Sequence, residues 1–248
     1  MLTLQEFFTE HPKVALAFSG GADSAYLLYE AQNCGADVHP YFVKTQFQPQ
    51  FEDDDAHRLC SQLGIKLTTI DVNILSVPEV VRNPSNRCYY CKSAIFTAIK
   101  AQAGTDGYDI VIDGTNASDL VNDRPGMRAL QELAVLSPLR ICGITKDELR
   151  KLSGKAGLFT AHKPAYACLA TRIPTGTTIC NEDLVRIEES ENILFRLGYT
   201  DFRIRLRDDK ALLQLTPEQR LRAIDEKALL DELLSGMFLK VDIDEKTR

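Results

Sequence analysis

The sequence lacks the usual features of membrane, secreted and nucleic-acid-binding proteins. None of its apolar runs approaches the roughly 20 residues needed to cross a bilayer. The first residues, MLTLQEFFTEHPK, contain no basic region followed by an apolar block, so a secretory signal is not expected. Excess positive charge is also missing, because the formal net charge is −6. We therefore expect a cytoplasmic protein with no membrane contact and no general attraction for nucleic acid.

The composition is ordinary for a globular protein, apart from the cysteines. Hydrophobic residues make up 44% and charged residues 26% of the 248 positions, which suits one large domain or two small ones. Seven cysteines without an export signal point toward thiols, metal binding or catalysis rather than disulfides. Four of them stand among apolar or helical neighbours and are expected to pack as small hydrophobic residues. These four are Cys34, Cys60, Cys142 and Cys180.

The first half of the chain alternates strand-like and helix-like segments. The predicted strands are Val14–Phe18, Val38–Val43, Leu67–Asp71 and a fourth in YDIVIDGTN, residues 108–116, which ends in a turn. The predicted helices between them are Ala25–Cys34, Ala56–Leu63 and Lys92–Ala103. Repeated strand–helix units predict an α/β fold with a doubly wound parallel sheet, in which ligands bind at the C-terminal ends of the strands.

The last part of the chain follows a different pattern. Thr145 and Glu148 have capping-box spacing, which predicts the start of a helix. After the turn-rich stretch FTAHKPAYACLATRIPTGT, the sequence predicts helices at 181–197 and 217–234, a β-hairpin at 202–215 and a last strand near 238–241. We therefore predict two domains, a parallel-sheet domain at 1–180 and a small α+β unit at 181–248.

The turn SGGADS, residues 19–24, stands between the first predicted strand and the first of these helices. Gly20 and Gly21 permit positive φ and let a ligand approach the backbone closely. Amides at a helix N-terminus, together with the hydroxyls of Ser19 and Ser24, suit an anion such as phosphate. Asp23 would repel a phosphate unless its carboxylate caps the helix or meets a cation. The turn is not a Walker A motif, which needs a lysine and a longer spacing.

The other three cysteines form a second motif. Cys88 and Cys91 have C-x-x-C spacing in NPSNRCYYCKSAIF, just before a predicted helix, and Cys168 lies far away in KPAYACLATRIPTG. Three thiolates can hold a 4Fe-4S cluster with one iron open. They can also hold zinc with a fourth ligand such as His162, or the pair can be a redox motif. Unrelated thiols are the remaining interpretation.

The turn SGGADS resembles the PP-loop of the ATP pyrophosphatases. In that superfamily the loop holds the pyrophosphate end of ATP, commonly with Mg2+, while the α-phosphate adenylylates a substrate oxygen. The blocks FSGGADS, NRCYYCK, DGTN, DRPGMRAL, SPL and KPAYACLATRIPTG are similar, in this order, to those of the lactate racemase maturation sulfur transferase (LarE) family. This resemblance implies ATP-dependent formation of a thiocarboxylate on the mononucleotide precursor of the nickel-pincer nucleotide cofactor.

The resemblance also bears on the source of the sulfur. Some members of the family have only the cysteine that matches Cys168, which gives up its own sulfur and becomes dehydroalanine. Others have three cysteines and bind a cluster. The present sequence resembles this second type, with Cys88, Cys91 and Cys168 as the implied cluster ligands. The sulfur nucleophile would then be a sulfide on the open iron or the Cys168 thiolate itself.

For the nucleotide, the resemblance implies that the PP-loop residues Ser19, Gly20, Gly21, Asp23 and Ser24 hold the phosphates. Lys92 and Arg172 are candidates for stabilising phosphate charge, or else solvated surface cations. Adenine is expected near the end of the second strand, from Val43 to Thr45. The turn after the fourth strand is expected to face the same crevice. That turn consists of Asp113, Gly114, Thr115 and Asn116.

For the mononucleotide, Glu191, Arg203 and Arg205 resemble residues that line the substrate pocket of the family. The alternation in FRIRL predicts that Arg203 and Arg205 share one face of a strand, where they would grip a substrate phosphate. The other interpretation is an exposed strand edge made polar by arginine. Family members form trimer-based hexamers, so we expect a homo-oligomer in which residues 181–248 contribute to substrate binding and assembly.

Two features depart from the family pattern. Ala117 and Ser118 precede Asp119 where family members often have consecutive acidic residues, and the tail FLKVDIDEKTR lacks a glycine- and serine-rich end. Three alternatives to the family function remain. A cluster-dependent tRNA thiolase also combines a PP-loop with three cysteines, but it predicts a basic surface. An amide-forming synthetase explains the PP-loop without the cysteines, and a nucleotide-binding regulatory module needs only the fold.

Overall fold

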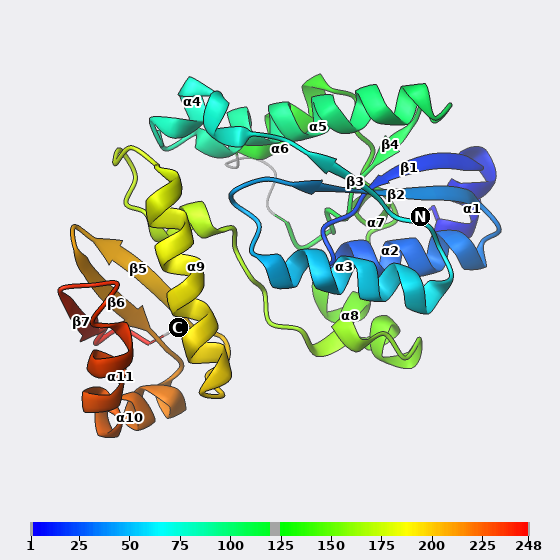
Figure 1. The fold of residues 1–248 in the computed structure, drawn as a ribbon. Coiled ribbons are helices and arrows are strands. Elements are labelled where there is room, and N and C mark those ends of the chain that lie inside the picture. Colours follow the sequence, from blue (N-terminus) through cyan, green and yellow to red (C-terminus); the bar gives the residue numbers. More distant parts are fainter. Residues whose placement is uncertain (1, 120–124, 248) are drawn as a thin grey trace. The chain divides into compact units, whose positions relative to one another are not determined.

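The chain folds into two units. A computed structural model describes residues 2–119 and 125–247 (Figure 1). The first unit consists of Met1–Ile74 and Asn86–Lys163, and the second consists of Leu75–Ser85 and Pro164–Arg248. Within the described ranges, no helix is both long enough and apolar enough to span a membrane.

A parallel sheet forms the centre of the first unit. In the described residues its strands have the order β3-β2-β1-β4, and each neighbouring pair is parallel. The strands are β1 Lys13–Ala17, β2 Asp37–Lys44, β3 Thr68–Asp71 and β4 Val111–Ile112. The predicted parallel α/β fold is confirmed. The fourth strand, β4, is short, and the turn predicted at its end begins at Asp113, whose carboxylate accepts a hydrogen bond from the Thr115 amide at 3.2 Å.

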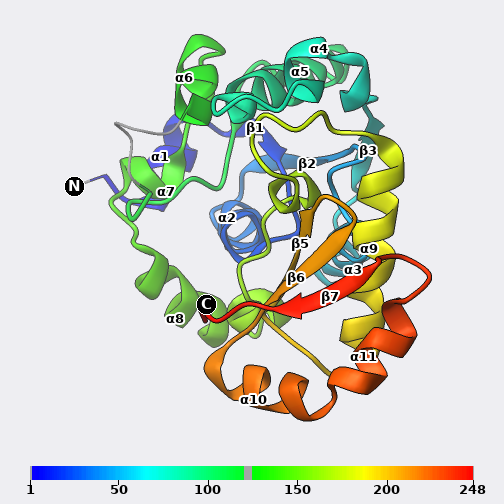
Figure 2. The same cartoon turned by 90° about the vertical axis from the view of Figure 1, so that its left-hand side faces the viewer.

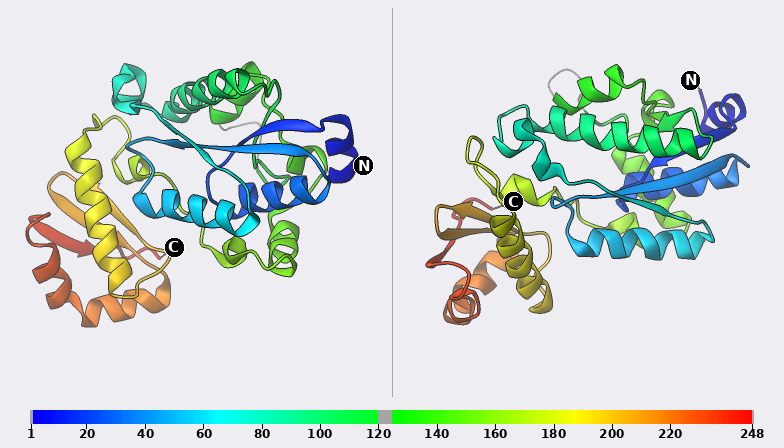
Figure 3. Two further views of the ribbon diagram at one scale, coloured as in Figure 1. Left: turned by 45° about the vertical axis from the view of Figure 1, so that its right-hand side comes forward. Right: turned by 45° about the horizontal axis from the view of Figure 1, so that its top comes forward.

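Helices cover both faces of this sheet. α2 Ala22–Asn33 and α3 Gln50–Leu63 lie on one face, and α5 Arg87–Thr105 lies on the other (Figures 1 and 3). Further helices are α1 Leu4–Glu10, α6 Pro125–Glu132, α7 Pro138–Ile141, α8 Lys146–Lys155 and the 3-10 helix η2 Phe159–His162. Successive β1 side chains enter opposite cores, Leu16 with Leu27 of α2 and Ala15 with Phe96 of α5. Because both faces are buried, β1 is apolar from Val14 to Ala17, after the exposed Lys13.

One helix begins earlier than the sequence predicts. α5 begins at Arg87 rather than Lys92, so Cys88 and Cys91 lie inside its first turns and not before it. The N-cap residue, Asn86, makes no side-chain capping hydrogen bond. The start of α5 therefore lacks the side-chain cap on which the prediction of helix N-termini from sequence usually relies.

The second unit contains a small mixed sheet (Figure 2). In the described residues its order is β5-β6-β7, with β5 and β6 antiparallel and β6 and β7 parallel. The strands are β5 Arg203–Arg207, β6 Lys210–Gln214 and β7 Lys240–Ile243, which confirms the predicted hairpin. The helices of this unit include α4 Pro78–Val81, η3 Leu169–Arg172, α9 Asn181–Arg196, α10 Pro217–Asp225 and α11 Lys227–Leu234. The 3-10 helix η1 Ile74–Ser76 stands where the chain passes between units.

The predicted helix at 217–234 is divided into α10 and α11 at Glu226. This residue is the C-cap of α10 and the N-cap of α11. Its carboxylate accepts hydrogen bonds from the Tyr199 hydroxyl and from Nε of Arg222, both at 2.8 Å. The contact with Tyr199 anchors the junction to the end of α9, and such a tertiary contact leaves no local sequence signal.

The boundary between the units differs from the predicted position near residue 180. Residues 164–180 belong to the second unit, together with the earlier segment 75–85. Hydrogen bonds join these two segments: the amide of Gly176 donates to the carbonyl of Asn83 at 2.8 Å, and the amide of Ile179 donates to the carbonyl of Val81 at 2.9 Å. The Asn83 side chain also donates to the carbonyl of Pro174 at 2.8 Å. Pairing between segments so distant in sequence cannot be read from local patterns.

Candidate functional site

The turn SGGADS joins the C-terminal end of β1 to the N-terminus of α2. Gly20 has a φ of +68°, and a Cβ built on it would lie 3.0 Å from the carbonyl oxygen of Glu52. Both the left-handed backbone and the close approach of α3 therefore require glycine at this position. Gly21 is the N-cap of α2, so the first amides of the helix are available at the loop, where the helix dipole favours an anion.

Hydroxyl contacts fasten the loop to the first turn of α2. The Ser19 amide donates to Oγ of Ser24 at 3.3 Å, and the two serine hydroxyls lie 3.2 Å apart. The Ser24 hydroxyl also donates to the carbonyl of Gly21 at 3.3 Å. Gly114 packs directly against this turn, because a Cβ built on it would lie 2.9 Å from the Ser24 nitrogen. The DGTN turn after β4 therefore contacts residues 19–24, which we call the candidate phosphate loop.

Asp23 has a cation partner that the sequence analysis missed. Its carboxylate forms an ion pair with Nζ of Lys146 and accepts a hydrogen bond from the side-chain amide of Asn116 at 3.1 Å. Lys146 is the first residue of α8, directly after Thr145. Thr145 is the N-cap, and its hydroxyl accepts from the Glu148 amide at 3.3 Å, as predicted. In the sequence Lys146 looks like any residue in the first turn of a helix. Only the packing of α8 on α2 shows that it is the partner of Asp23.

Ala117 and Ser118, which depart from the pattern of the LarE family, help to position Lys146. The Ser118 hydroxyl accepts a hydrogen bond from the Lys146 amide at 3.0 Å, and the Ala117 amide donates to the carbonyl of Ile144 at 2.8 Å. Asp119 accepts from the Asn116 amide at 3.1 Å. The segment after the DGTN turn therefore anchors the start of α8 beside Asp23.

A cavity of about 550 Å³ opens over the candidate phosphate loop within the first unit. Its polar wall includes Ser19, Asp23, Ser24, Asp113, Gly114, Thr115 and Asp119. Its apolar wall includes Phe18, Val43, Ile95, Phe96 and Met127. A cavity with one polar, charged wall and one apolar wall suits a nucleotide, whose phosphates and base need these two environments.

The end of β2 contributes to this cavity in a way that differs slightly from the prediction. Val43 lines the cavity, whereas Thr45 is buried and donates its hydroxyl to the side-chain oxygen of Gln48 at 2.5 Å. Gln48 itself lines the cavity. Thr45 thus orients a cavity residue through a hydrogen bond.

α5 brings two predicted site residues to the same cavity. Cys88 and Lys92 are four residues apart, so they share one face of the helix, and both line the cavity. Gly126 of α6 makes room for the lysine, because a Cβ built on it would lie 2.9 Å from Cδ of Lys92. Gly126 belongs to the block DRPGMRAL, of which Asp123 and Arg124 lie outside the described residues.

The three candidate cluster ligands are divided between the two units. Cys88, which is exposed, and Cys91, which is half-buried, belong to the first unit, and the half-buried Cys168 belongs to the second. In residues 2–119 and 125–247, the structure contains no group of three His, Cys, Asp or Glu side chains placed to share a metal ion. The alternative zinc ligand His162 is exposed in η2 of the first unit.

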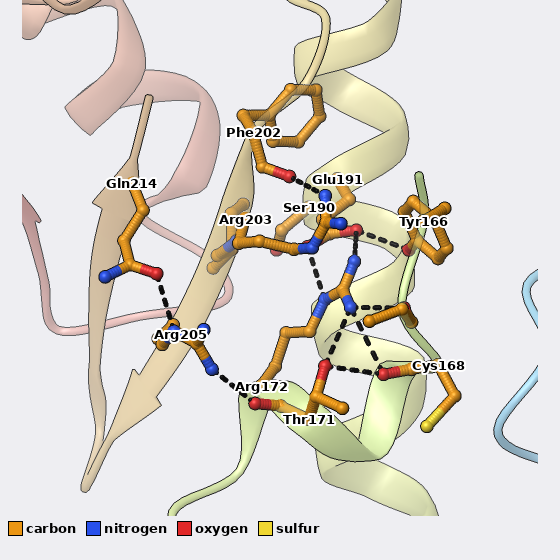
Figure 4. A network of polar contacts seen from close by, with 12 residues as sticks. Tyr166, Cys168, Thr171, Arg172, Ser190, Glu191, Phe202, Arg203, Arg205 and Gln214 are labelled. Carbon is orange, nitrogen blue, oxygen red and sulfur yellow. Dashed lines mark hydrogen bonds and ion pairs between the residues drawn. The ribbon is translucent and has the colours of Figure 1, made fainter. Parts of the chain in front are cut away.

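Arg172 occupies a different environment from the one predicted for a phosphate ligand. Its side chain is fully buried and pairs with the carboxylate of Glu191 through Nε at 2.9 Å and Nη2 at 3.0 Å (Figure 4). Nη1 donates to the carbonyl of Cys168 at 3.1 Å and also to that of Ala167. Burial alone lowers the pKa of Arg172, but hydrogen bonding and charge attraction from Glu191 outweigh it and raise the net pKa. This geometry indicates a structural role.

The other predicted substrate residues join the same network. Glu191, which is 1% exposed, also accepts hydrogen bonds from the Tyr166 hydroxyl and, at 3.0 Å, from the Ile204 amide. Arg203 and Arg205 project from the same face of β5, as predicted (Figure 4). Both donate hydrogen bonds to backbone or amide oxygens of the second unit, and the guanidinium of Arg203 also lies over the ring of Tyr166. Their role toward a substrate phosphate stays a prediction.

The parallel sheet, the SGGADS turn and the cavity above it define a PP-loop protein of the α/β class. No family model matches the chain. It is 36% identical to an uncharacterized protein of Synechocystis sp., over 97% of this chain and 91% of that one. It is 31% identical to an uncharacterized protein of Methanocaldococcus jannaschii, over 97% and 92% of the two chains. The chain therefore belongs to the same family as these two proteins.

A relative with a defined activity has slightly lower identity. The chain is 29% identical to the pyridinium-3,5-bisthiocarboxylic acid mononucleotide synthase of Lactiplantibacillus plantarum, a LarE-type enzyme, over 88% of this chain and 80% of that one. It is 25% identical to the tRNA-specific 2-thiouridylase of Pseudothermotoga lettingae, over 75% of this chain and 62% of that one. These similarities support assignment of the chain to the PP-loop sulfur transferases.

Proposed function

We propose that the protein is an ATP-dependent sulfur transferase that converts a carboxylate of a pyridinium mononucleotide into a thiocarboxylate. The observation that carries this proposal is the shared cavity of the first unit. The candidate phosphate loop forms one part of its wall, and Cys88 of the C-x-x-C motif forms another. Nucleotide activation and sulfur chemistry are thus supported at one place. The similarity to the Lactiplantibacillus plantarum synthase supports a pyridinium mononucleotide as the acceptor.

The first step overcomes the poor leaving group of a carboxylate. A carboxylate oxygen attacks the α-phosphorus of ATP, a new P–O bond forms, and the bond to pyrophosphate breaks. The product is an acyl-adenylate with AMP as leaving group. The loop amides and the hydroxyls of Ser19 and Ser24 would bind the departing pyrophosphate, and the charges of Lys92 and Lys146 would balance it.

Magnesium would accompany ATP in this cavity. Carboxylate oxygens are preferred ligands of Mg2+, and Asp23 and Asp119 both line the cavity. Asp23 pairs with Lys146 in the structure. Asp23 and Asp119 would hold a bound Mg2+, and Lys146 would then pair with the phosphate oxygens of the nucleotide.

The second step delivers sulfur to the acyl carbon and releases AMP. The three thiols fit a 4Fe-4S cluster chemically, since thiolates are its usual ligands. Cys88 is exposed and Cys91 and Cys168 are half-buried, so none of the three is sealed in a core. A bound cluster would supply a replaceable sulfide as nucleophile. Cys88, Cys91 and Cys168 would serve as its ligands, and the two α5 cysteines would present their thiolates from adjacent positions on one turn.

The similarity to tRNA-specific 2-thiouridylases makes a tRNA base the alternative acceptor. A net charge of −6 opposes this second candidate, because tRNA binding depends strongly on positive charge. A tRNA mobility shift at physiological salt, with competition by the mononucleotide, separates the two acceptors.

The sulfur source is tested by anaerobic turnover followed by intact-protein mass spectrometry, with iron and sulfide analysis of the same sample. We expect bound iron, an unchanged protein mass and repeated turnover when sulfide is added. Cys88→Ser should lose the iron and the sulfur transfer, whereas Cys34→Ser, outside the motif, should keep both. Loss of one sulfur with dehydroalanine at position 168 would refute the cluster and leave the sacrificial route. Pyrophosphate release without dependence on a carboxylate substrate would refute the transferase itself.

A further inference from the structure

The segment that carries Cys168, residues 165–171, is bound mainly through its backbone carbonyl oxygens (Figure 4). We call it the Cys168 segment. Ala165 accepts a hydrogen bond from Arg203 Nη2 at 2.6 Å, and Thr171 accepts from Arg205 Nη1 at 2.6 Å. The carbonyls of Ala167 and Cys168 accept from Nη1 of Arg172. Guanidinium groups therefore supply donors along a segment whose regular structure is limited to the short 3-10 helix η3.

Tyr166 lies at the centre of these contacts. Its hydroxyl donates to Glu191, and its ring lies 4.3 Å from the guanidinium carbon of Arg172 and 5.0 Å from that of Arg203. A guanidinium over an aromatic ring is attracted by the negative face of the ring. One side chain of the Cys168 segment thus contacts two of the arginines that bind the carbonyls of the same segment.

The buried pair of Arg172 and Glu191 depends on such additional contacts. The two side chains are 0% and 1% exposed. A buried ion pair is stable only when further hydrogen bonds satisfy its remaining donors and acceptors. Tyr166 supplies one of these to Glu191, and the carbonyls of the Cys168 segment accept from Arg172. The hydroxyl of Tyr166 therefore influences where the Arg172 guanidinium lies, and through it the backbone at Cys168.

We infer that Tyr166 is a positioning residue that acts through Glu191 and Arg172 to fix the backbone of Cys168 for sulfur transfer. The Cys168 sulfur points away from the guanidinium groups (Figure 4). The hydrogen bonds of the arginines go to the backbone carbonyls of the segment. This inference deepens the proposed function and rests on it for the role of Cys168. It assigns a role to Tyr166 that neither the sequence motifs nor the resemblance indicated.

The same unit contains a matched arrangement that does not involve the Cys168 segment. The Tyr199 hydroxyl donates to Glu226 at 2.8 Å, and the guanidinium carbon of Arg222 lies 4.4 Å from the Tyr199 ring. Arg222 and Glu226 form an ion pair at 2.8 Å. Here the arginine donates to the carbonyl of Leu197, at the end of α9. Tyr199 is therefore a control with the same chemistry and a different location.

The test compares Tyr166→Phe with Tyr199→Phe, since each substitution removes one hydroxyl and keeps the ring. The holoprotein is assayed for ATP KM, for carboxylate-dependent pyrophosphate release and for kcat of thiocarboxylate formation. For Tyr166→Phe we expect kcat of sulfur transfer to fall about tenfold, the effect of losing a hydrogen bond to a charged group. ATP KM and the first-turnover burst of pyrophosphate at saturating mononucleotide should remain within about twofold of wild type, because both precede sulfur transfer. Tyr199→Phe should leave all three values unchanged.

Hydrogen exchange measured by mass spectrometry on the same proteins gives a second readout that needs no turnover. Peptides covering residues 165–171 should exchange faster in Tyr166→Phe and at the wild-type rate in Tyr199→Phe. Wild-type sulfur transfer in Tyr166→Phe, or an equal loss in both variants, would overturn the inference. If the wild-type protein forms no thiocarboxylate, the proposed function fails. Exchange at residues 165–171 then still decides whether Tyr166 holds the segment.

Discussion

Replacing Gly114 by alanine should disturb the candidate phosphate loop, residues 19–24, although Gly114 is not part of that loop. Gly114 belongs to the turn after β4, and a Cβ built on it would lie 2.9 Å from the Ser24 nitrogen. It would also lie 3.2 Å from the Asp23 carbonyl carbon and from Cα of Ser24. These are backbone atoms of the first turn of α2, so no rotamer change can relieve the contact. Either the DGTN turn or the loop must move.

The size of the effect follows from this contact. Inserting a methyl group into a closely packed site costs about 1–3 kcal/mol. The matched control is Gly104→Ala, in α5 of the same unit, where a Cβ meets no atom within 4 Å. Alanine is favoured over glycine inside a helix by about 0.5–1 kcal/mol. The same added methyl group should therefore destabilise Gly114→Ala and stabilise Gly104→Ala.

Thermal unfolding followed by circular dichroism measures this difference. One kcal/mol shifts Tm by about 2–4 °C in a protein of this size. Gly114→Ala should therefore lower Tm by about 2–12 °C, and Gly104→Ala should raise it by about 1–4 °C. Isothermal titration calorimetry should show weaker ATP binding only in Gly114→Ala. A Gly114→Ala protein with wild-type Tm and wild-type ATP affinity would refute the close approach of the turn to the loop.

Two further predictions concern charged groups of the first unit. Lys146→Met removes the partner of Asp23, and because both side chains are about 30% exposed, stability should change by less than about 1 kcal/mol. Pyrophosphate release should nevertheless fall at least about tenfold, whereas Lys151→Met in the same helix should release pyrophosphate normally. Equal effects of the two variants would contradict the role of Lys146 in balancing the pyrophosphate charge. Tyr41→Phe removes the hydrogen bond that is the main cause of the lowered pKa of Asp106. A lowered carboxyl pKa stabilises the fold only while the group is ionised. The free energies of unfolding of wild type and Tyr41→Phe, measured in urea, should therefore differ most near neutral pH, and the difference should shrink below about pH 3.9. A difference that does not depend on pH would contradict this prediction.

Several features of the protein could be predicted from neighbouring residues alone. The alternation of apolar strands and amphipathic helices indicated the parallel α/β fold, because burial on a sheet or helix imposes its own period on the sequence. The glycines and serines of the SGGADS turn indicated an anion site, because the backbone there needs positive φ at Gly20 and leaves helix amides open. The alternation in FRIRL placed Arg203 and Arg205 on one face of β5.

Other features depended on how distant segments pack. Lys146 meets Asp23 because α8 packs on α2, and residues 75–85 belong to the second unit, where Val81 and Asn83 form hydrogen bonds with residues 174–179. Arg172 had the sequence context of a phosphate ligand, but Glu191 of α9 and the carbonyls near Cys168 surround it. The physical reason is the range of the interactions. Turn conformation and strand or helix period are decided by residues a few positions apart, and these the sequence determined by itself. Ion-pair partners and burial depend on which elements come into contact, and only the tertiary structure decided them.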